Sequence, residues 1–509
     1  PTPTPTPNPH PTPHPPPQKL KKKKKNKKKK KIKKKKKKLK KKKKKKKKKN
    51  SPKRCISVFA LAMINLAAIG SVKNWPITAE YGFASIFYLL LAALVFFFFF
   101  FLVSAELATG WPQAGGVFVW VKEAFGIKAG FLAIWLQWIE NVIWYPTILS
   151  FIAATLAYLF KPALAGNTMY TLAVVLISFW SATLLNLMGM QASSLISSVS
   201  VVLGSFIPGI FIIGLGLFWF FQGNLLEIAL DWQHLIPNVP SIDSMVFFTG
   251  VILSFCGMEM SAAHARDVKN PQRNYPRAIL LSVVIILSMS VLGVLSIASV
   301  VPQKEISLVA GSMQAFVYFF DRYNLSGLIP FIAALVAIGA FGSMSTWIVG
   351  PTKGLLAAAK SGDLPPIFRS VNQKAVPVNL LILQAIIVTF LSLVFVCMPS
   401  VSSAFWILTV IVAQLYLIMY ILLFASAIKL RYTKPHIKRS YLVPGGKLGI
   451  WFISGLGILS SVFAIAIGFV PPSQIETGSF LFYEGFLIVG VLSGCFAPSL
   501  ILFFQKPHW

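Results

Sequence analysis

The first candidate for chemistry in this sequence is an acidic residue inside an apolar stretch. Glu259 lies two residues after Gly257 in the segment 255–276 (FCGMEMSAAHARDVKNPQRNYP), which continues an apolar run from Met245. Charging a carboxylate among lipid tails costs several kcal/mol, so it must face a wet cavity, pair or stay protonated. Gly257 lets a helix loosen, and loosened backbone at this depth is tolerated where it lines a cavity. The segment predicts a discontinuous helix at a transporter site; the alternative is a structural glutamate bonded to neighbouring backbone.

A second interrupted segment lies near the start of the apolar region. Residues 65–76 (NLAAIGSVKNWP) place small residues and Gly70 where a spanning helix has its middle, followed by Lys73 and Pro76. A break near residues 67–71 would expose backbone N–H groups, and the N-terminal end of a helix favours an anion such as a carboxylate. The alternative is a kinked packing helix. Two interrupted segments at corresponding positions of two halves indicate a transporter site.

A third apolar segment, residues 137–146, carries Glu140 and Asn141 amid tryptophans. An ionisable residue inside a membrane segment is a functional hypothesis by default. Glu140 would act as a counter-ion for a cationic amine or as a proton carrier, or would pair with a basic or amide group on a neighbouring helix. These interpretations remain open from the residues alone.

The composition places the chain among polytopic membrane proteins. Hydrophobic residues make up 55% of it, charged residues 13%, and the mean hydropathy is +0.69, values outside the soluble range. The four cysteines lie in or beside apolar runs without the close spacing of a metal or redox motif, so we interpret them as small hydrophobes. We find no haem, zinc or nucleotide motif and no clustered nucleophile, base and metal ligands. The sequence therefore predicts no enzyme, cofactor, metal site or ATP-driven pump.

The strong positive charge comes from one low-complexity region. Residues 19–49 hold 27 of the 50 Lys and Arg residues, after a Pro/Thr-rich stretch at residues 1–17. Neither part has anything apolar to bury, so we predict that residues 1–52 are disordered and that no nucleic acid is bound. The tract would tether the chain to anionic lipid. Alternatively it is artefactual, because AAA encodes Lys, TTT encodes Phe and residues 96–101 are all Phe; the true start would then lie near Pro52.

Residues 53–509 predict an all-α domain of about twelve transmembrane helices, because each apolar run is long enough to cross a bilayer. We place the spans at residues 56–75, 84–108, 126–158, 169–187, 196–221, 245–265, 276–301, 327–350, 377–398, 402–428, 449–470 and 482–505. Two stretches between spans, residues 105–126 and 349–368, look soluble, and we expect them to hinge or to lie along the membrane surface.

Basic residues predict the orientation. The loops after the sixth, eighth and tenth spans are rich in Lys and Arg, whereas the loop after the fifth has Glu227, Asp231 and Asp243 with no basic residue. By the positive-inside rule both termini are cytoplasmic.

Five stretches together resemble the amino acid–polyamine–organocation (APC) superfamily of transporters, and within it the bacterial glutamate/γ-aminobutyrate antiporters. They are AELATGWPQAGGVFVWV (105–121), FCGMEMSAAHARDVKNPQRNYPRAI (255–279), STWIVGPTKGLLAAAKSGDLPPIF (345–368), VPVNL (376–380) and LVPGGKLG (442–449). They occur in the family's order from about Ser57 to the end of the chain.

The resemblance implies a LeuT-type fold: two inverted repeats of five helices, the first helix of each unwound around a central site, and two further C-terminal helices. It implies exchange of an external amino acid for an internal amine or amino acid across a bacterial inner membrane. With the two carboxylate-bearing segments included, the candidate substrate-binding residues are Asn65, Ala67, Ala68, Ile69, Gly70, Ser71, Glu140, Asn141, Cys256, Gly257, Met258 and Glu259.

Three features depart from that family. Glu140 aligns with an apolar position, Ser343 aligns with an acidic one, and only residues 505–509 follow the last span, so we expect no folded C-terminal plug. Two alternatives to antiport therefore stay open. One is a proton-coupled permease for another amino acid or polyamine, and the other is a transporter-like amino acid sensor. The absence of a sizeable soluble output domain weighs against the sensor.

Overall fold

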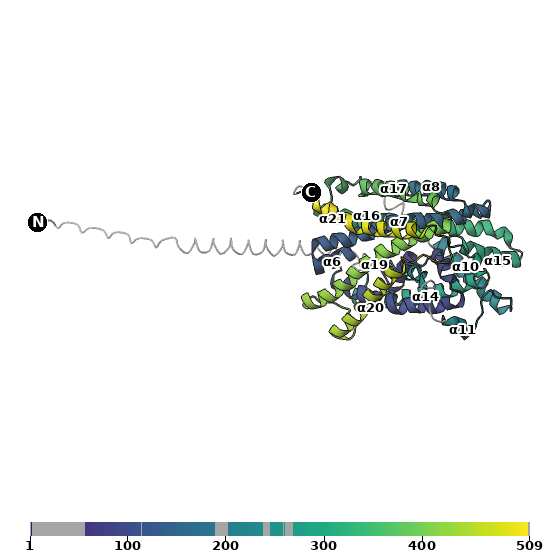
Figure 1. Cartoon of the computed structure of the whole chain (residues 1–509). Helices are drawn as coiled ribbons and strands as arrows, with labels where there is room; N and C mark the ends of the chain where they lie inside the picture. Colours follow the sequence, from purple (N-terminus) through teal and green to yellow (C-terminus); the bar gives the residue numbers. More distant parts are fainter. Residues whose placement is uncertain are drawn as a thin grey trace. The chain divides into compact units, whose positions relative to one another are not determined.

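The computed structural model describes residues 2, 56–112, 115–188, 202–237, 245–257, 259 and 268–506. Within these residues the regular structure is helical (Figure 1), and an isolated bridge between Ile56 and Val268 is the sole β contact. The predicted all-α class is therefore confirmed. The predicted boundary between residues 52 and 53 falls outside the described residues and stays a prediction.

Ten helical runs in the described part of the chain are long and apolar enough to cross a membrane. They are α4 (Ser85–Ala92) continuing through η3 (Ala93–Phe97) into α5 (Phe98–Gly110), α7 (Ile127–Ala157), α8 (Thr168–Leu187), η5 (Val202–Phe206) with α10 (Ile207–Phe221), α14 (Pro271–Ala298), α16 (Ile329–Ser361), α17 (Val378–Ser392) with α18 (Val394–Cys397), α19 (Val401–Thr433), α20 (Gly446–Ile467) and α21 (Phe480–Phe503). The chain is thus a multi-pass membrane protein.

Where the structure describes them, the two remaining predicted spans, 56–75 and 245–265, contain shorter helical pieces. The first contains α2 (Val58–Ile69), η1 (Val72–Asn74) and α3 (Trp75–Ala79), and the second contains α13 (Phe248–Leu253). Each is too short alone to cross the hydrocarbon core. The count of twelve spans and the inverted repeat therefore stay predictions.

Short helices connect the long ones. They are η2 (Gly82–Ala84), α6 (Val117–Phe125), η4 (Pro162–Gly166), α11 (Trp232–Leu235), η7 (Gln303–Glu305), α15 (Gly311–Arg322), η8 (Ser326–Leu328) and η9 (Pro366–Arg369). The stretch 105–126, expected to hinge or to lie along the membrane surface, contains the end of α5 and all of α6, which packs against α7 and α19.

One expected loop is helical instead. Residues 349–368 look like a soluble stretch that hinges or lies along the membrane surface, whereas α16 continues through Pro351 to Ser361. A proline removes one helical hydrogen bond without ending a helix that packing holds on both sides. Leu355 and Ala358, beyond the proline, are buried. The apolar face of α16 therefore extends past the point where local sequence signals an end.

Local capping fixes several of the helix starts. The Ser57 side chain accepts from the Ala60 N–H at the start of α2, and the Ser400 side chain accepts from the Ser403 N–H at the start of α19, at 3.1 and 3.0 Å. Such a cap satisfies one of the N–H groups that a first turn leaves without a partner.

The centre of the bundle is built on α7 and α19. Most residues of α7 and of α19 are buried, whereas few residues of α21 are, which places α21 at the periphery. Figure 1 shows α7 and α16 running side by side, with α19 beside α6 and α20, and these neighbours are in contact. Side chains on α7 and α19 therefore face the interior, where Glu140 and Asn141 lie.

Candidate functional site

The first helix breaks where the sequence predicts. α2 ends at Ile69, and the N–H of its capping residue Gly70 bonds to the Leu66 carbonyl at 2.6 Å. Ser71 is extended, and its side chain accepts from the Lys73 N–H at 3.3 Å. The chain resumes as η1 and α3. The predicted interruption near residues 67–71 is therefore confirmed.

The second interruption follows α13. After a turn at Ser254 and Phe255, Cys256 and Gly257 are not helical. Gly257 has φ +114°, where an L side chain is strained, and an added Cβ would lie 3.2 Å from the Trp347 ring. The Gly257 N–H donates to the Tyr420 hydroxyl at 2.9 Å. This backbone is thus held by a side chain of α19 instead of by a helical neighbour.

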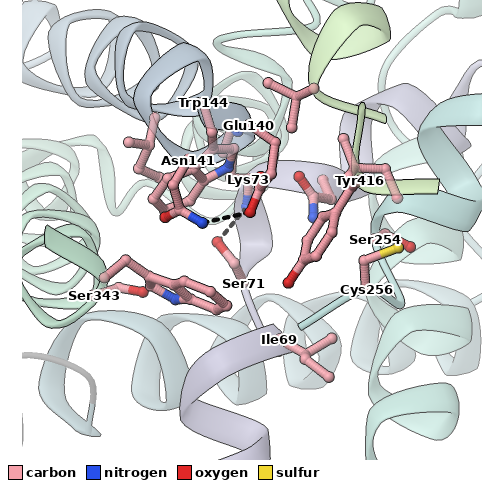
Figure 2. Close-up of a pocket in the computed structure, with 15 residues that line it drawn as sticks. Ile69, Ser71, Lys73, Glu140, Asn141, Trp144, Ser254, Cys256, Ser343 and Tyr416 are labelled. Carbon is pink, nitrogen blue, oxygen red and sulfur yellow. Dashed lines mark hydrogen bonds between the residues drawn. The ribbon is translucent and has the colours of Figure 1, made fainter. Parts of the chain in front are cut away.

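Both interruptions open onto one cavity of about 60 Å³, room for a few water molecules. Figure 2 shows it, with the hydroxyl groups of Ser71 and Tyr416 on facing sides. The described residues that line it are Ile69, Ser71, Lys73, Asn74, Glu140, Asn141, Trp144, Ile148, Leu253, Ser254, Cys256, Ser343, Trp347, Val412 and Tyr416. α7 therefore supplies a carboxylate and an amide to the point where the two broken segments meet.

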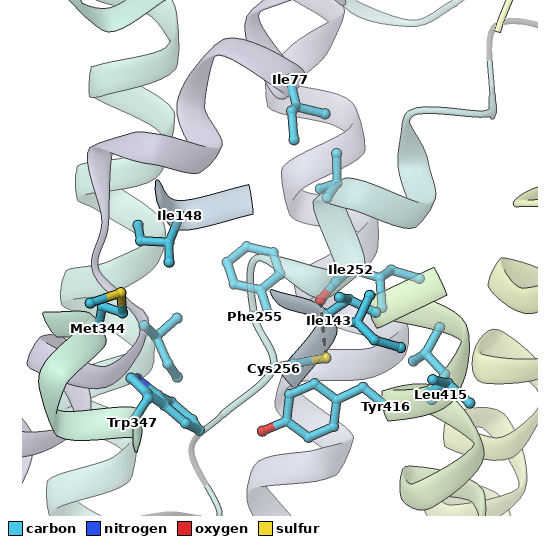
Figure 3. Close-up of a cluster of buried hydrophobic side chains, with 14 of the residues drawn as sticks. Ile77, Ile143, Ile148, Ile252, Phe255, Cys256, Met344, Trp347, Leu415 and Tyr416 are labelled. Atoms are coloured by element: carbon cyan, nitrogen blue, oxygen red, sulfur yellow. Dashed lines mark hydrogen bonds between the residues drawn. The ribbon is translucent and has the colours of Figure 1, made fainter. Parts of the chain in front are cut away.

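Apolar side chains surround these polar groups. Figure 3 shows Phe255 and Cys256 of the second interrupted segment near Trp347, Ile148 and Tyr416. Phe255 and Cys256 are buried. In such surroundings a charge interacts more strongly with a ligand than it would in water.

Five of the predicted site residues line the cavity: Ile69, Ser71, Glu140, Asn141 and Cys256. Gly70 and Gly257 shape the two breaks instead. The side chains of Ala67 and Ala68, and all of Met258, lie outside the described residues. Asn65 is elsewhere in the packing, since its Nδ2 donates to the Ser282 hydroxyl of α14 at 2.9 Å.

Glu259 is buried behind the cavity. Its Oε1 accepts from Gln137 Nε2 at 3.1 Å and from the Tyr416 hydroxyl, and its Oε2 accepts from the Tyr420 hydroxyl at 2.5 Å. Among the described residues the cavity lining includes Tyr416 but not Glu259. Tyr416 therefore connects the carboxylate to the cavity, and the partners of Glu259 include side chains of α7 and α19.

Sequence reasoning missed Tyr416 and Tyr420. They are spaced four apart on α19 and therefore share one helix face. Two tyrosines at this spacing inside an apolar span were the available signal.

Glu140 and Asn141 lie next to each other on the cavity wall. Asn141 Nδ2 donates to Glu140 Oε1 at 2.5 Å and to the Gln137 carbonyl at 3.4 Å. The Asn141 Oδ1 is buried and has no hydrogen-bond partner among the described residues. The wall thus presents hydrogen-bond acceptors towards the cavity.

A buried lysine on the wall was also missed. Lys73 lines the cavity, and its Nζ donates to the Thr147 hydroxyl at 2.8 Å. The ammonium lies 5.3 Å from the Trp144 ring centroid and 5.2 Å from that of Phe405. The sequence did offer one sign of it, because Lys73 is the sole basic residue between Arg54 and Lys122.

An all-helical membrane bundle with two broken segments around a polar cavity is the architecture of a secondary transporter. The model of the amino acid permease family matches residues 55–492. The chain belongs to this family, within the APC superfamily, and is a membrane transporter rather than an enzyme.

Three relatives show how similar the chain is to known members. It is 46% identical to an uncharacterized transporter of Legionella pneumophila, over 90% of this chain and 98% of the relative. It is 34% identical to a glutamate/γ-aminobutyrate antiporter of Lactococcus lactis, over 88% and 90%. It is 26% identical to a cadaverine/lysine antiporter of Escherichia coli, over 68% and 73%. The predicted superfamily and its antiporter likeness are confirmed, and the substrates are amino acids or amines as a class.

Proposed function

We propose that this protein exchanges amino acids across the bacterial inner membrane, as an antiporter of the glutamate/γ-aminobutyrate type. The observation that carries the proposal is the meeting of two broken segments at one cavity that also receives the buried side chain of Glu140; they contribute Ile69 and Ser71, and Ser254 and Cys256. The similarity to the Lactococcus antiporter supports the same class of substrate. The basic loops support an orientation with both termini cytoplasmic.

In this mechanism the two broken segments offer backbone groups to the substrate, and Glu140 and Asn141 offer acceptors. Tyr416 lines the cavity and also donates to Glu259. A substrate that moves Tyr416 therefore changes the hydrogen bonds of Glu259, and with them the contact between the second broken segment and α19. Substrate promotes occlusion only as far as the occluded state binds it better. Exchange further requires that the empty carrier reorients more slowly than the loaded one.

The test is uptake of radiolabelled glutamate into proteoliposomes preloaded with γ-aminobutyrate, glutamate, arginine or nothing. We expect uptake with γ-aminobutyrate or glutamate inside and little uptake into empty vesicles. Equal uptake into empty vesicles under an imposed proton gradient would favour a proton-coupled permease. Binding without uptake in any condition would favour a sensor.

Single substitutions test the site. Glu259→Gln and Glu140→Gln should each lower exchange about tenfold or more, since each removes a charged hydrogen-bonding group. Glu227→Gln, at an exposed acid outside the cavity, is the matched control and should exchange like the wild type. Wild-type rates in both site variants would remove these carboxylates from the mechanism.

A further inference from the structure

The cavity contains a buried lysine that the proposed exchange does not yet use. Lys73 is 3% exposed. Its ammonium has three N–H donors, and the described residues provide one hydroxyl acceptor, on Thr147, together with the faces of Trp144 and Phe405. No carboxylate in the described part of the chain forms an ion pair with it. Hydrogen-bonding capacity of the ammonium is therefore left for a ligand.

The aromatic faces stabilise this cation only in part. A cation near an aromatic ring gains about 0.5–2 kcal/mol, whereas removing an ion from water costs several kcal/mol even after the protein relaxes. An anionic group next to the Lys73 ammonium would offset the difference. The cavity is where such a group can enter, because Lys73 lies on its wall.

The same wall carries groups of the opposite kind. Glu140 is 2% exposed and accepts from Asn141 Nδ2, and the Asn141 Oδ1 is unpartnered among the described residues. Figure 2 shows Lys73, Glu140 and Asn141 together at the cavity. Lys73 and Glu140 nevertheless form no ion pair with each other. A buried basic side chain and a buried acidic side chain thus face one small space without forming an ion pair with each other.

We propose that Lys73 binds the carboxylate of the substrate and that Glu140, with Asn141 Oδ1, binds its ammonium group. The site then selects zwitterions, molecules that carry both charges, over amines or carboxylic acids that carry one. This inference rests on the proposed function and names its substrate class. A simple amine leaves the Lys73 charge unpaired, and a simple acid leaves Glu140 unpaired. A buried charge left without its partner is what makes such a site discriminate strongly.

Three four-carbon ligands separate the two charges. γ-Aminobutyrate carries both, butylamine carries the ammonium alone and butyrate carries the carboxylate alone. Binding is measured with the purified full chain in detergent by isothermal titration calorimetry, as the Kd of each ligand. We expect the wild type to bind γ-aminobutyrate about 10- to 100-fold more tightly than either single-charge ligand, the range for one charged hydrogen-bonding contact.

Substitutions assign each charge to its residue. Lys73→Met keeps an apolar stem between the two rings and should weaken γ-aminobutyrate about 10- to 100-fold while leaving butylamine unchanged. Glu140→Gln should weaken γ-aminobutyrate and leave butyrate unchanged. Lys73→Arg restores the charge and should recover part of the preference. Lys161→Met, at an exposed lysine, is the matched control and should bind like the wild type.

The contrary results are equally specific. A Lys73→Met protein that binds γ-aminobutyrate as tightly as the wild type overturns the proposal. So does a loss of the same size for all three ligands, which would make Lys73 a packing residue. A wild type without preference for the zwitterion overturns it as well. Exchange in proteoliposomes is read separately, so the proposed function can stand when this inference fails. If the wild type shows neither exchange nor binding of any of these ligands, both fail.

Discussion

Two buried carboxylates of similar exposure have different surroundings. Glu106, on α5, is 1% exposed, and Glu140, in the cavity, is 2% exposed. Glu106 Oε1 accepts from Arg431 Nε and from Arg439 Nη1, each at 2.9 Å, and its Oε2 accepts from Arg431 Nη2 and from the Val443 N–H at 2.8 Å. Glu140 accepts from Asn141 among the described residues. The first acid has donors on both oxygens, whereas the second retains capacity to bind a ligand.

The difference indicates what each charge does. The Glu106 group joins the end of α5 to the end of α19 and to the segment that follows α19. A buried ion pair contributes little net stability but is costly to break from one side, so we interpret it as a structural cross-link. The cavity charges cost stability without such compensation, and we expect that cost where a protein must bind a ligand.

Removing the cross-link should have the largest effect. Glu106→Ala leaves two arginine charges without their carboxylate, and we expect stability to fall by about 3–5 kcal/mol. The measurement is thermal unfolding of the purified protein in detergent, read as Tm. Glu123→Ala is the matched control: its ion pair with Lys434 is 32% exposed on each side, so about 0–1 kcal/mol is expected. Equal Tm values for the two variants would contradict the expected difference between the buried Glu106 ion pairs and the exposed Glu123 ion pair.

Replacing the buried lysine of the cavity, Lys73, should raise the stability of the protein instead of lowering it. Lys73→Met removes a buried charge that has no ion pair in the described structure and keeps an apolar chain between Trp144 and Phe405. We expect Tm to rise by roughly 1–3 °C while binding of γ-aminobutyrate weakens about 10- to 100-fold. The same unfolding assay decides it. A fall in Tm like that of Glu106→Ala would place Lys73 with the structural charges.

A third carboxylate extends the comparison, because its contribution to stability depends on pH. Glu80 follows α3, outside the membrane-spanning runs, and burial raises its pKa from 4.5 to about 8. The folded protein therefore holds this proton more tightly than the unfolded chain does. The stability that Glu80 contributes is complete below its ordinary pKa and is lost as the pH rises through about 8.

We expect the Tm of the wild type to fall by a few degrees between about pH 5 and about pH 9 because of Glu80. The Glu80→Gln variant should lack this contribution to the fall. Melting curves of the two proteins across this pH range are the measurement. Identical pH profiles would show that Glu80 is no more buried in the native protein than in the unfolded chain.

Much of the candidate site could be predicted from local sequence. Gly70 and Gly257 mark the two breaks, and Glu140 stands out because a carboxylate is rare among apolar residues. Ser343, noted as a departure from the related antiporters, also lines the cavity. These features were visible because each contrasts with its immediate neighbours in the chain.

Lys73 was not assigned a role, although it lies within the first predicted span, residues 56–75. The sequence around it does not show whether its side chain reaches water or lies buried. Its burial depends on Thr147, Trp144 and Phe405, which other helices bring to it. No residue near Lys73 in the sequence indicates that these distant side chains will contact it.

The sequence by itself determined that this is a helical membrane transporter whose helices break in two places. Hydropathy, glycine and proline act over neighbouring residues, so their effects can be recognised without a fold. Only the tertiary structure decided which charges are paired and which face the cavity. Lys73 meets Thr147 across 74 residues, and Glu106 meets Arg431 across 325. Pairing and burial depend on contacts between distant helices, and those contacts exist only once the bundle has packed.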